Sequence, residues 1–168
     1  MTTRVAQLRN AFDRNFATPP PPLEPARSDF LCIRVGGEPS AIALGDIASL
    51  HADLRVVALP SHATELLGVA AIRAAVVPIY DLGVAFGVAR TSTARWTVLL
   101  RDGLAGFAFD GYDGHARIAD RDVAAAPPGG HVRGQFTHDG QPRSVVDLRS
   151  VLTAIETRWR PRRPAEDQ

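Results

Sequence analysis

The sequence predicts an all-β fold of short strands with few and brief helices. First, runs of four to six residues rich in Val, Ile, Phe and Trp recur between Phe30 and Leu152. Second, Gly, Pro, Asp and His separate these runs, as turn residues separate strands. Third, the stretch 68–82 is echoed at 134–148, which indicates two related subdomains. This combination is typical of a small β-barrel or a pair of barrels.

A helical pattern opens the chain. The apolar residues on one face of this predicted helix are Val5, Leu8, Phe12 and Phe16. We therefore predict an N-terminal amphipathic helix over residues 1–17, followed by a Pro-rich linker over 18–27, because four consecutive prolines cannot continue a helix. Three alternatives stay open for the helix: packing on its own domain, docking on a partner, or disorder.

Strands are expected at nine places after the linker. They are 30–35, 40–44, 55–59, 69–73, 75–80, 95–100, 104–109, 132–136 and 143–146. Short helices are expected around 62–68 and 82–87, and a longer one near the C-terminus. The apolar stripe of the C-terminal helix consists of Leu148, Val151, Leu152, Ile155 and Trp159.

The residue types present exclude several kinds of chemistry. All 19 basic residues are Arg, so the chain has no lysine for a phosphate-binding loop or a Schiff base. The single Cys32 lies within an apolar run, which predicts a core residue and no internal disulfide. The net charge of +1 gives no reason to expect a polyanionic partner. No apolar window suits a signal peptide or a membrane span, so we expect a soluble, cytoplasmic protein.

Neither metal binding nor catalysis is predicted. The five histidines show no metal-binding spacing. The aspartates of 110–122 lack the alternation of a calcium loop, and their Asp-Gly pairs predict turns. Ser61, His62 and Asp81 do not have the spacing of a catalytic triad. We expect no cofactor and no enzyme activity.

The echo pairs "GVAAIRAAVVPIYDL" with "GQFTHDGQPRSVVDL". Each stretch begins with Gly and reaches an Asp 13 residues later, followed by Leu. We predict two hairpins whose second strands deliver Asp81 and Asp147 as helix N-caps. The second hairpin turns on Asp139-Gly140, which suits a tight turn, whereas the aligned pair in the first is Arg73-Ala74.

Arg73 and Ala74 are poor turn residues, because positive φ costs a residue with a Cβ about 1 kcal/mol. One interpretation is that Arg73 makes bidentate contacts with a partner carboxylate or backbone. The other is that it pairs with an acidic residue of its own domain. Sequence spacing leaves both open.

These residues carry a resemblance to CheW-like domains. The signature segment of that family is matched at Gly68, Val69, Arg73, Pro78, Asp81 and Leu82. Three further segments resemble it in order: "DFLCIRVGGEPSAIALGDIASL", "WTVLLRDGLAGFAFDGYDGHARI" and "VRGQFTHDGQPRSVVDLRSVL". The resemblance implies two small intertwined five-stranded β-barrels, of SH3 or OB type, with a hydrophobic seam, short helices and a C-terminal helix. It implies a CheW-like domain over 28–157, followed by a polar tail over 158–168.

The resemblance also implies a non-catalytic adaptor in a chemosensory pathway. Its partners would be the regulatory domain of a CheA-type histidine kinase and the cytoplasmic tip of a chemoreceptor. Carried over by position, Ile47 and Leu50 match apolar positions that face the kinase, and Arg73 matches an arginine near both contacts. Ala71 and Ala74 stand at the same hairpin tip, where the family favours Asn and Gly. We therefore predict an exposed apolar patch of Ile47, Leu50 and the 69–74 hairpin, bordered by Arg73.

Two further hypotheses complete the interpretation. The N-terminal extension indicates a pathway-specific adaptor, for a chemosensory output other than swimming. The rival function is a small β-barrel module that binds nucleic acid or another protein outside chemosensing, but the chain lacks the basic groove and exposed aromatic residues that a nucleic acid needs.

Overall fold

The structure of the protein is a computed structural model that describes residues 25–89 and 94–159. The predicted helix over 1–17, nearly all of the linker, and the tail beyond residue 159 lie outside these residues. The first two residues of the predicted tail, Arg158 and Trp159, belong to the C-terminal helix.

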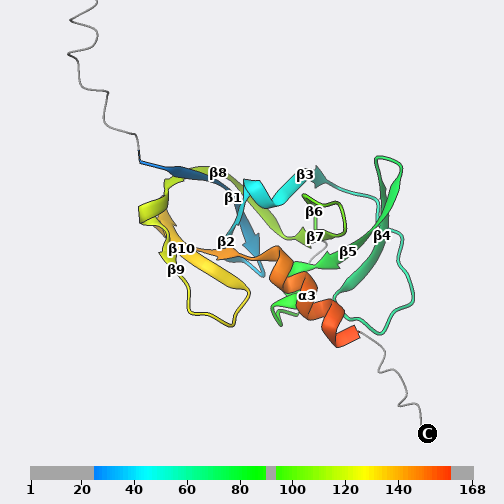
Figure 1. Ribbon diagram of the computed structural model, residues 1–168. Coiled ribbons are helices and arrows are strands. Elements are labelled where there is room, and N and C mark those ends of the chain that lie inside the picture. Colours follow the sequence, from blue (N-terminus) through cyan, green and yellow to red (C-terminus); the bar gives the residue numbers. More distant parts are fainter. Residues whose placement is uncertain (1–24, 90–93, 160–168) are drawn as a thin grey trace, which may run out of the picture.

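Two mainly antiparallel sheets make up the described part of the chain (Figure 1). The six-stranded sheet has the order β8 (Gly111–Ala119), β1 (Arg27–Val35), β2 (Glu38–Ala43), β11 (Gln141–Val146), β10 (Val132–His138) and β9 (Ala124–Ala125). The five-stranded sheet has the order β3 (Ile47–Ala52), β6 (Trp96–Leu100), β7 (Gly106–Phe109), β5 (Ala75–Asp81) and β4 (Leu66–Ile72). The helical elements are η1 (Leu44–Asp46), α2 (Leu82–Ala85), η2 (Asp120–Asp122) and α3 (Leu148–Trp159).

The all-β prediction is confirmed, with one correction. The resemblance implied two closed five-stranded barrels, whereas the described strands form one sheet of six and one of five, and the pairing order of each ends in edge strands. Side chains of each sheet form a buried cluster of their own. A core therefore forms although the hydrogen-bond ladder does not close into a barrel.

The two halves of the chain exchange strands. The β1–β2 hairpin of the first half lies between β8 and β11 of the second half. Conversely, the β6–β7 hairpin of the second half lies between β3 and β5 of the first. Parallel pairing of β2 with β11 and of β5 with β7 joins the halves within each sheet. The predicted intertwining is therefore real, and neither sheet is complete without both halves.

The two echoed segments form equivalent hairpins, as predicted. The β4–β5 hairpin turns on Arg73 and Ala74, with φ of 47° and 65°. The β10–β11 hairpin turns on Asp139 and Gly140, with φ of 51° and 72°. Positive φ at both central residues is the two-residue turn whose twist matches a hairpin.

The predicted helix caps are also confirmed. The Asp81 carboxylate accepts a hydrogen bond from the Val84 backbone N–H at 3.1 Å. In the same way, the Asp147 carboxylate accepts one from the Ser150 backbone N–H at 3.0 Å. Each second strand therefore leads directly to the residue that caps the following helix: β5 ends at Asp81, and β11 ends one residue before Asp147.

The glycine that opens each echoed segment has a steric role. A Cβ on Gly68 would lie 2.1 Å from the Val57 backbone oxygen, and its φ is +145°. A Cβ on the equivalent Gly134 would lie 3.0 Å from the Ala124 backbone oxygen. In both halves another segment, which we call the covering segment, crosses the outer edge of the hairpin at this glycine. It contains Val57 and Ala58 in the first half and β9 in the second. Only a residue without a side chain permits so close an approach.

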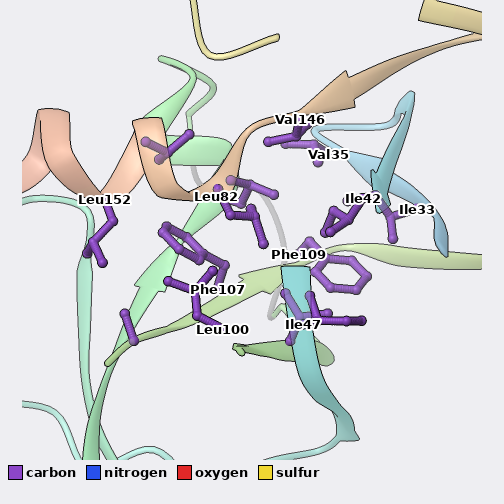
Figure 2. Packing of buried hydrophobic residues seen from close by; sticks show 14 of the residues in the cluster. Ile33, Val35, Ile42, Ile47, Leu82, Leu100, Phe107, Phe109, Val146 and Leu152 are labelled. Carbon is purple, nitrogen blue, oxygen red and sulfur yellow. The ribbon is translucent and has the colours of Figure 1, made fainter. Parts of the chain in front are cut away.

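The core has three parts. Each sheet encloses a small cluster, and the largest cluster is shared between the two sheets and both α-helices (Figure 2). Ile33 and Ile42 reach it from the six-stranded sheet, and Leu100 and Phe107 from the five-stranded sheet. The predicted hydrophobic seam is thus confirmed. Cys32 is 1% exposed, as expected of a core residue, and burial raises the pKa of its thiol.

Two element predictions were wrong, and two strands were missed. Residues 55–59 form no strand and contribute only a bridge from Val57 to Val69. Residues 62–68 are not helical, because the leucines there begin β4. The strands β3 and β8 were not predicted, and Asp113-Gly114 lies inside β8 instead of forming a turn.

Candidate partner-binding surface

The β4–β5 hairpin has one buried and one outward face. Ala70, Ile72, Val77 and Ile79 point inward and are at most 5% exposed. The alternate residues point outward and form two directly opposed pairs, Val69 with Pro78 and Ala71 with Val76. Val76 is 74% exposed, the highest value among the large apolar side chains of the described residues.

The covering segment extends this outward face. Val57 and Val69 exchange two backbone hydrogen bonds of 2.8 and 2.9 Å, so their side chains share the outer side of the hairpin. Val57 is 56% exposed. We call the set Val57, Val69, Ala71, Val76 and Pro78 the hairpin face. It lies at the right of Figure 1, at the edge of the five-stranded sheet remote from β10 and β9.

The equivalent hairpin shows that the fold does not require an apolar outer face. In β10–β11 the positions aligned with Val69, Ala71, Val76 and Pro78 are occupied by Gln135, Thr137, Pro142 and Ser144. The register of the two hairpins is the same, yet this second face is mostly polar. The apolar character of the hairpin face is therefore a property of this site rather than of the framework.

Arg73 and Ala74 stand exposed at the end of the hairpin. Within the part of the chain that the structure describes, Arg73 has no acidic partner. The interpretation that Arg73 pairs within its own domain thus finds no support among the described residues. A guanidinium with five N–H donors beside an apolar surface is suited to bind a carboxylate or backbone carbonyls of another protein.

The structure corrects the predicted patch at Ile47. This residue is 8% exposed and packs in the shared core near Leu100 and Phe109 (Figure 2). Leu50 is partly buried against the same core. Both residues lie on β3, at the opposite end of the sheet order from β4. The structure thus brings together Ala71, Arg73 and Ala74 but not Ile47 and Leu50.

A β-bulge explains why Ile47 and Leu50 both point inward. Ile47 pairs with Leu100 and Ser49 pairs with Leu99, so Ala48 is an extra residue in β3. The extra residue shifts the alternation, and Ile47 and Leu50 both point inward although three positions separate them. Val57 and Val76 carried no motif, but the alternation of 69–72 with 75–79 was enough to identify Val76 as outward-facing.

Neither a metal-binding cluster nor a membrane-spanning helix is found within the described residues. No group of three or more His, Cys, Asp or Glu side chains is placed there to hold a metal ion. None of the helices within 25–89 and 94–159 has the length and apolar character needed to cross a membrane.

Comparison with known proteins supports this description of the fold. The family model described as CheW-like domain matches residues 29–156. A crystal structure of the scaffolding protein TtCheW from Thermoanaerobacter tengcongensis is similar, with a TM-score of 0.65 and 16% sequence identity, over 72% of this chain and 89% of that one. Among curated proteins, none matches the sequence.

Proposed function

This chain belongs to the CheW-like domain family, and we propose that it is a non-catalytic adaptor of a chemosensory pathway. In this role it couples the cytoplasmic tip of a chemoreceptor to the regulatory domain of a CheA-type histidine kinase. The hairpin face, with Arg73 at its end, provides one of the contacts.

The observation that carries this proposal is the contrast between the two hairpins. The outer face of β10–β11 carries Gln135 and Thr137, whereas β4–β5 carries Val69 and Ala71 at the equivalent positions. Exposed apolar side chains favour aggregation unless they have a partner, so a contiguous apolar strip indicates an interface. An apolar centre with an arginine at its border is the composition typical of protein–protein contacts.

A binding titration tests the proposal. The protein is titrated calorimetrically with the kinase regulatory domain and, separately, with the receptor tip. We expect Val76→Glu and Arg73→Glu each to weaken the binding of at least one of these partners by about tenfold or more. The first substitution places a charge in an apolar contact, and the second reverses the charge at the border of that contact.

Thr137→Glu provides the matched control, since Thr137 occupies the position of Ala71 in the other hairpin and is also exposed. It should leave both affinities unchanged. The adaptor function is contradicted if the wild-type protein binds neither partner. The assignment of the hairpin face is contradicted if Val76→Glu and Arg73→Glu bind as tightly as Thr137→Glu.

A further inference from the structure

A second surface feature lies where the two sheets meet. It is a pocket of about 280 Å³ lined by Gly45, Asp46, Leu100, Arg101, Arg133, Asp147 and Arg149. The lining comes from η1, the end of β6, the start of β10 and the first turn of α3. Elements of both halves therefore build it, and the adaptor contact at the hairpin face does not involve it.

Two of the three arginines in the lining are paired with carboxylates. Arg133 donates to the Asp46 carboxylate at 2.6 Å. Arg149 donates to the Asp102 carboxylate at 2.5 Å. The remaining carboxylate, that of Asp147, caps α3.

Arg101 differs from the other two arginines. Its guanidinium donates to the backbone oxygens of Gly45 and Leu44, the latter at 3.2 Å. It has no carboxylate partner among the described residues. The two carbonyls hold the group in place and leave further N–H donors unused, because a guanidinium carries five.

The internal repeat shows what Arg101 lacks. The edge strands β3 and β8 occupy equivalent places in the two halves, and each contains a bulge. Ala48 is the extra residue of β3, and Asp113 is the extra residue of β8. At the first bulge Leu100 pairs with Ile47, and Arg101 is the next residue. At the second bulge Ile33 pairs with Tyr112, and Arg34 is the next residue. Arg34 pairs with the bulge residue itself, Asp113, at 3.0 Å. In the first bulge the residue at the position of Asp113 is Ala48, which has no carboxylate to offer Arg101.

Arg133 and Arg149 have no arginine counterpart in the first half. Arg133 precedes Gly134, and the residue before the equivalent Gly68 is Leu67. Arg149 lies two positions after Asp147, and the residue two after Asp81 is Gly83. The first half is built without charge at these two positions, so Arg133 and Arg149 are not needed to form the fold.

From this comparison we propose that the pocket beside Arg101 binds the carboxylate of an acidic side chain from a protein partner. The inference rests on the proposed adaptor function, since the partner is one of the proteins that the adaptor binds. The incoming Asp or Glu takes the place that Asp113 holds beside Arg34, and forms a bidentate ion pair with Arg101.

Charge favours a carboxylate over a phosphate. The lining residues carry three positive and two negative side chains, and the Asp102 carboxylate beside Arg149 brings the two signs into balance. A carboxylate adds one negative charge beside Arg101, whereas a phosphate monoester, with a charge near −2, adds about twice the repulsion against the carboxylates of Asp46 and Asp147. The pocket volume also suits one side chain better than a larger ligand.

Two substitutions test the site from opposite directions. Arg101→Gln removes the guanidinium. Ala48→Asp supplies the missing carboxylate from within the chain, at an exposed position, and should occupy Arg101. We expect each variant to weaken the binding of the kinase domain or of the receptor tip by about tenfold, the size of one charge-assisted contact.

Arg117→Gln is the control, because Arg117 is an exposed arginine on β8, 3.8 Å from Asp29 and outside the pocket. Thermal unfolding confirms that each variant is folded. The inference is contradicted if the wild type binds a partner and both pocket variants bind it as tightly as Arg117→Gln; that result leaves the adaptor function intact.

A second measurement needs no partner. The arginine Nε–H signals of the full-length protein are followed by NMR during titration with sodium acetate, and with sodium chloride as reference. We expect the Arg101 signal to move saturably with acetate alone, and to be displaced already in Ala48→Asp without acetate. Equal movement in the two salts would contradict the carboxylate site even if the protein bound neither proposed partner.

Discussion

Arg143 is buried at a position where the first half of the molecule has an apolar residue. It is opposite Phe136, in the place that Val77 takes opposite Ala70. The guanidinium donates to the Asp113 carboxylate at 2.9 Å and to the backbone oxygen of Ile33 at 3.3 Å. A buried charge of this kind is tolerated only when it is paired. The run 143–146 was correctly predicted as a strand, but nothing in the sequence indicated that Arg143 points inward.

Removing the partner of Arg143 should therefore be costly. Asp113→Asn leaves a guanidinium that is 6% exposed without its carboxylate, and also breaks the contact of Arg34. We expect a loss of about 3 kcal/mol in the free energy of unfolding at neutral pH, measured by denaturant titration. Asp29→Asn is the control, because among residues 25–89 and 94–159 the ion-pair partners of Asp29 are the exposed side chains of His115 and Arg117. Equal losses in the two variants would show that burial of the pair is unimportant.

The same carboxylate makes stability depend on pH. Burial of the Asp113 carboxyl raises its pKa, but the hydrogen bonds from Arg143 and Arg34 outweigh this effect and the net pKa is lowered. Its contribution is complete above the pKa of an unfolded Asp, about 4, and disappears as pH falls through the lower folded-state pKa. The wild type should thus lose more stability on acidification than Asp113→Asn. Parallel pH profiles would contradict this.

A comparison of two glycines tests the close approach at the hairpin edges. Gly68→Ala adds a Cβ where the Val57 oxygen lies only 2.1 Å away, at a φ of +145°. Gly134→Ala meets the Ala124 oxygen at 3.0 Å. We expect the first substitution to cost about 3 kcal/mol and the second about 1 kcal/mol, from denaturant unfolding. A larger loss of unfolding free energy in Gly134→Ala than in Gly68→Ala would contradict the steric explanation.

At the scale of elements, the repeated hairpins show what a sequence pattern can and cannot provide. Their turns, strands and caps were predictable because the two segments share a Gly, a turn pair and an Asp at matching positions. The edge strands β3 and β8 were not, because the bulges at Ala48 and Asp113 interrupt the alternation that identifies a strand. Ile47 was placed on the surface by position from the family resemblance, whereas the structure buries it. Local pattern fixes a hairpin, whereas a bulge appears only once the partner strand is known.

The turn of the β4–β5 hairpin offers a test of backbone strain. Ala74 has a φ of 65°, so Ala74→Gly should increase the free energy of unfolding by about 1 kcal/mol. Gly140→Ala, at the equivalent turn position with φ of 72°, should decrease it by a similar amount. Thermal and denaturant unfolding measure both. No gain in Ala74→Gly would mean that the turn at Arg73-Ala74 is not strained.

At the scale of the whole molecule, the exchange of strands makes one cooperative unit from two similar halves. In each sheet one hairpin comes from one half of the chain and all the other strands come from the other half. The shared core adds side chains from both sheets and both α-helices. No local pattern in the sequence indicates this order of strands, because the parallel pairs β2–β11 and β5–β7 join segments that are distant along the chain. The resemblance to CheW-like domains, rather than periodicity, predicted the intertwining.

Cutting the chain between the halves should reveal this interdependence. We expect fragments 1–91 and 92–168 to lack cooperative thermal unfolding when each is alone, since each would expose two unpaired sheet edges and part of the shared core. An equimolar mixture should recover the near-ultraviolet circular dichroism of the intact chain. A fragment that unfolds cooperatively by itself would show that a half can fold without strand exchange.

The exchange of strands also shapes how this protein is made. During synthesis the β1–β2 hairpin emerges first, but its neighbours β8 and β11 follow much later in the chain. Helix α3, which contributes Leu148, Val151, Leu152 and Ile155 to the shared core, comes near the end of the described residues. A ribosome that adds about 5–20 residues per second leaves the nascent chain without its final neighbours for several seconds. Native packing is thus largely postponed until α3 has been synthesised, and during that interval the edges of the early strands stay unpaired.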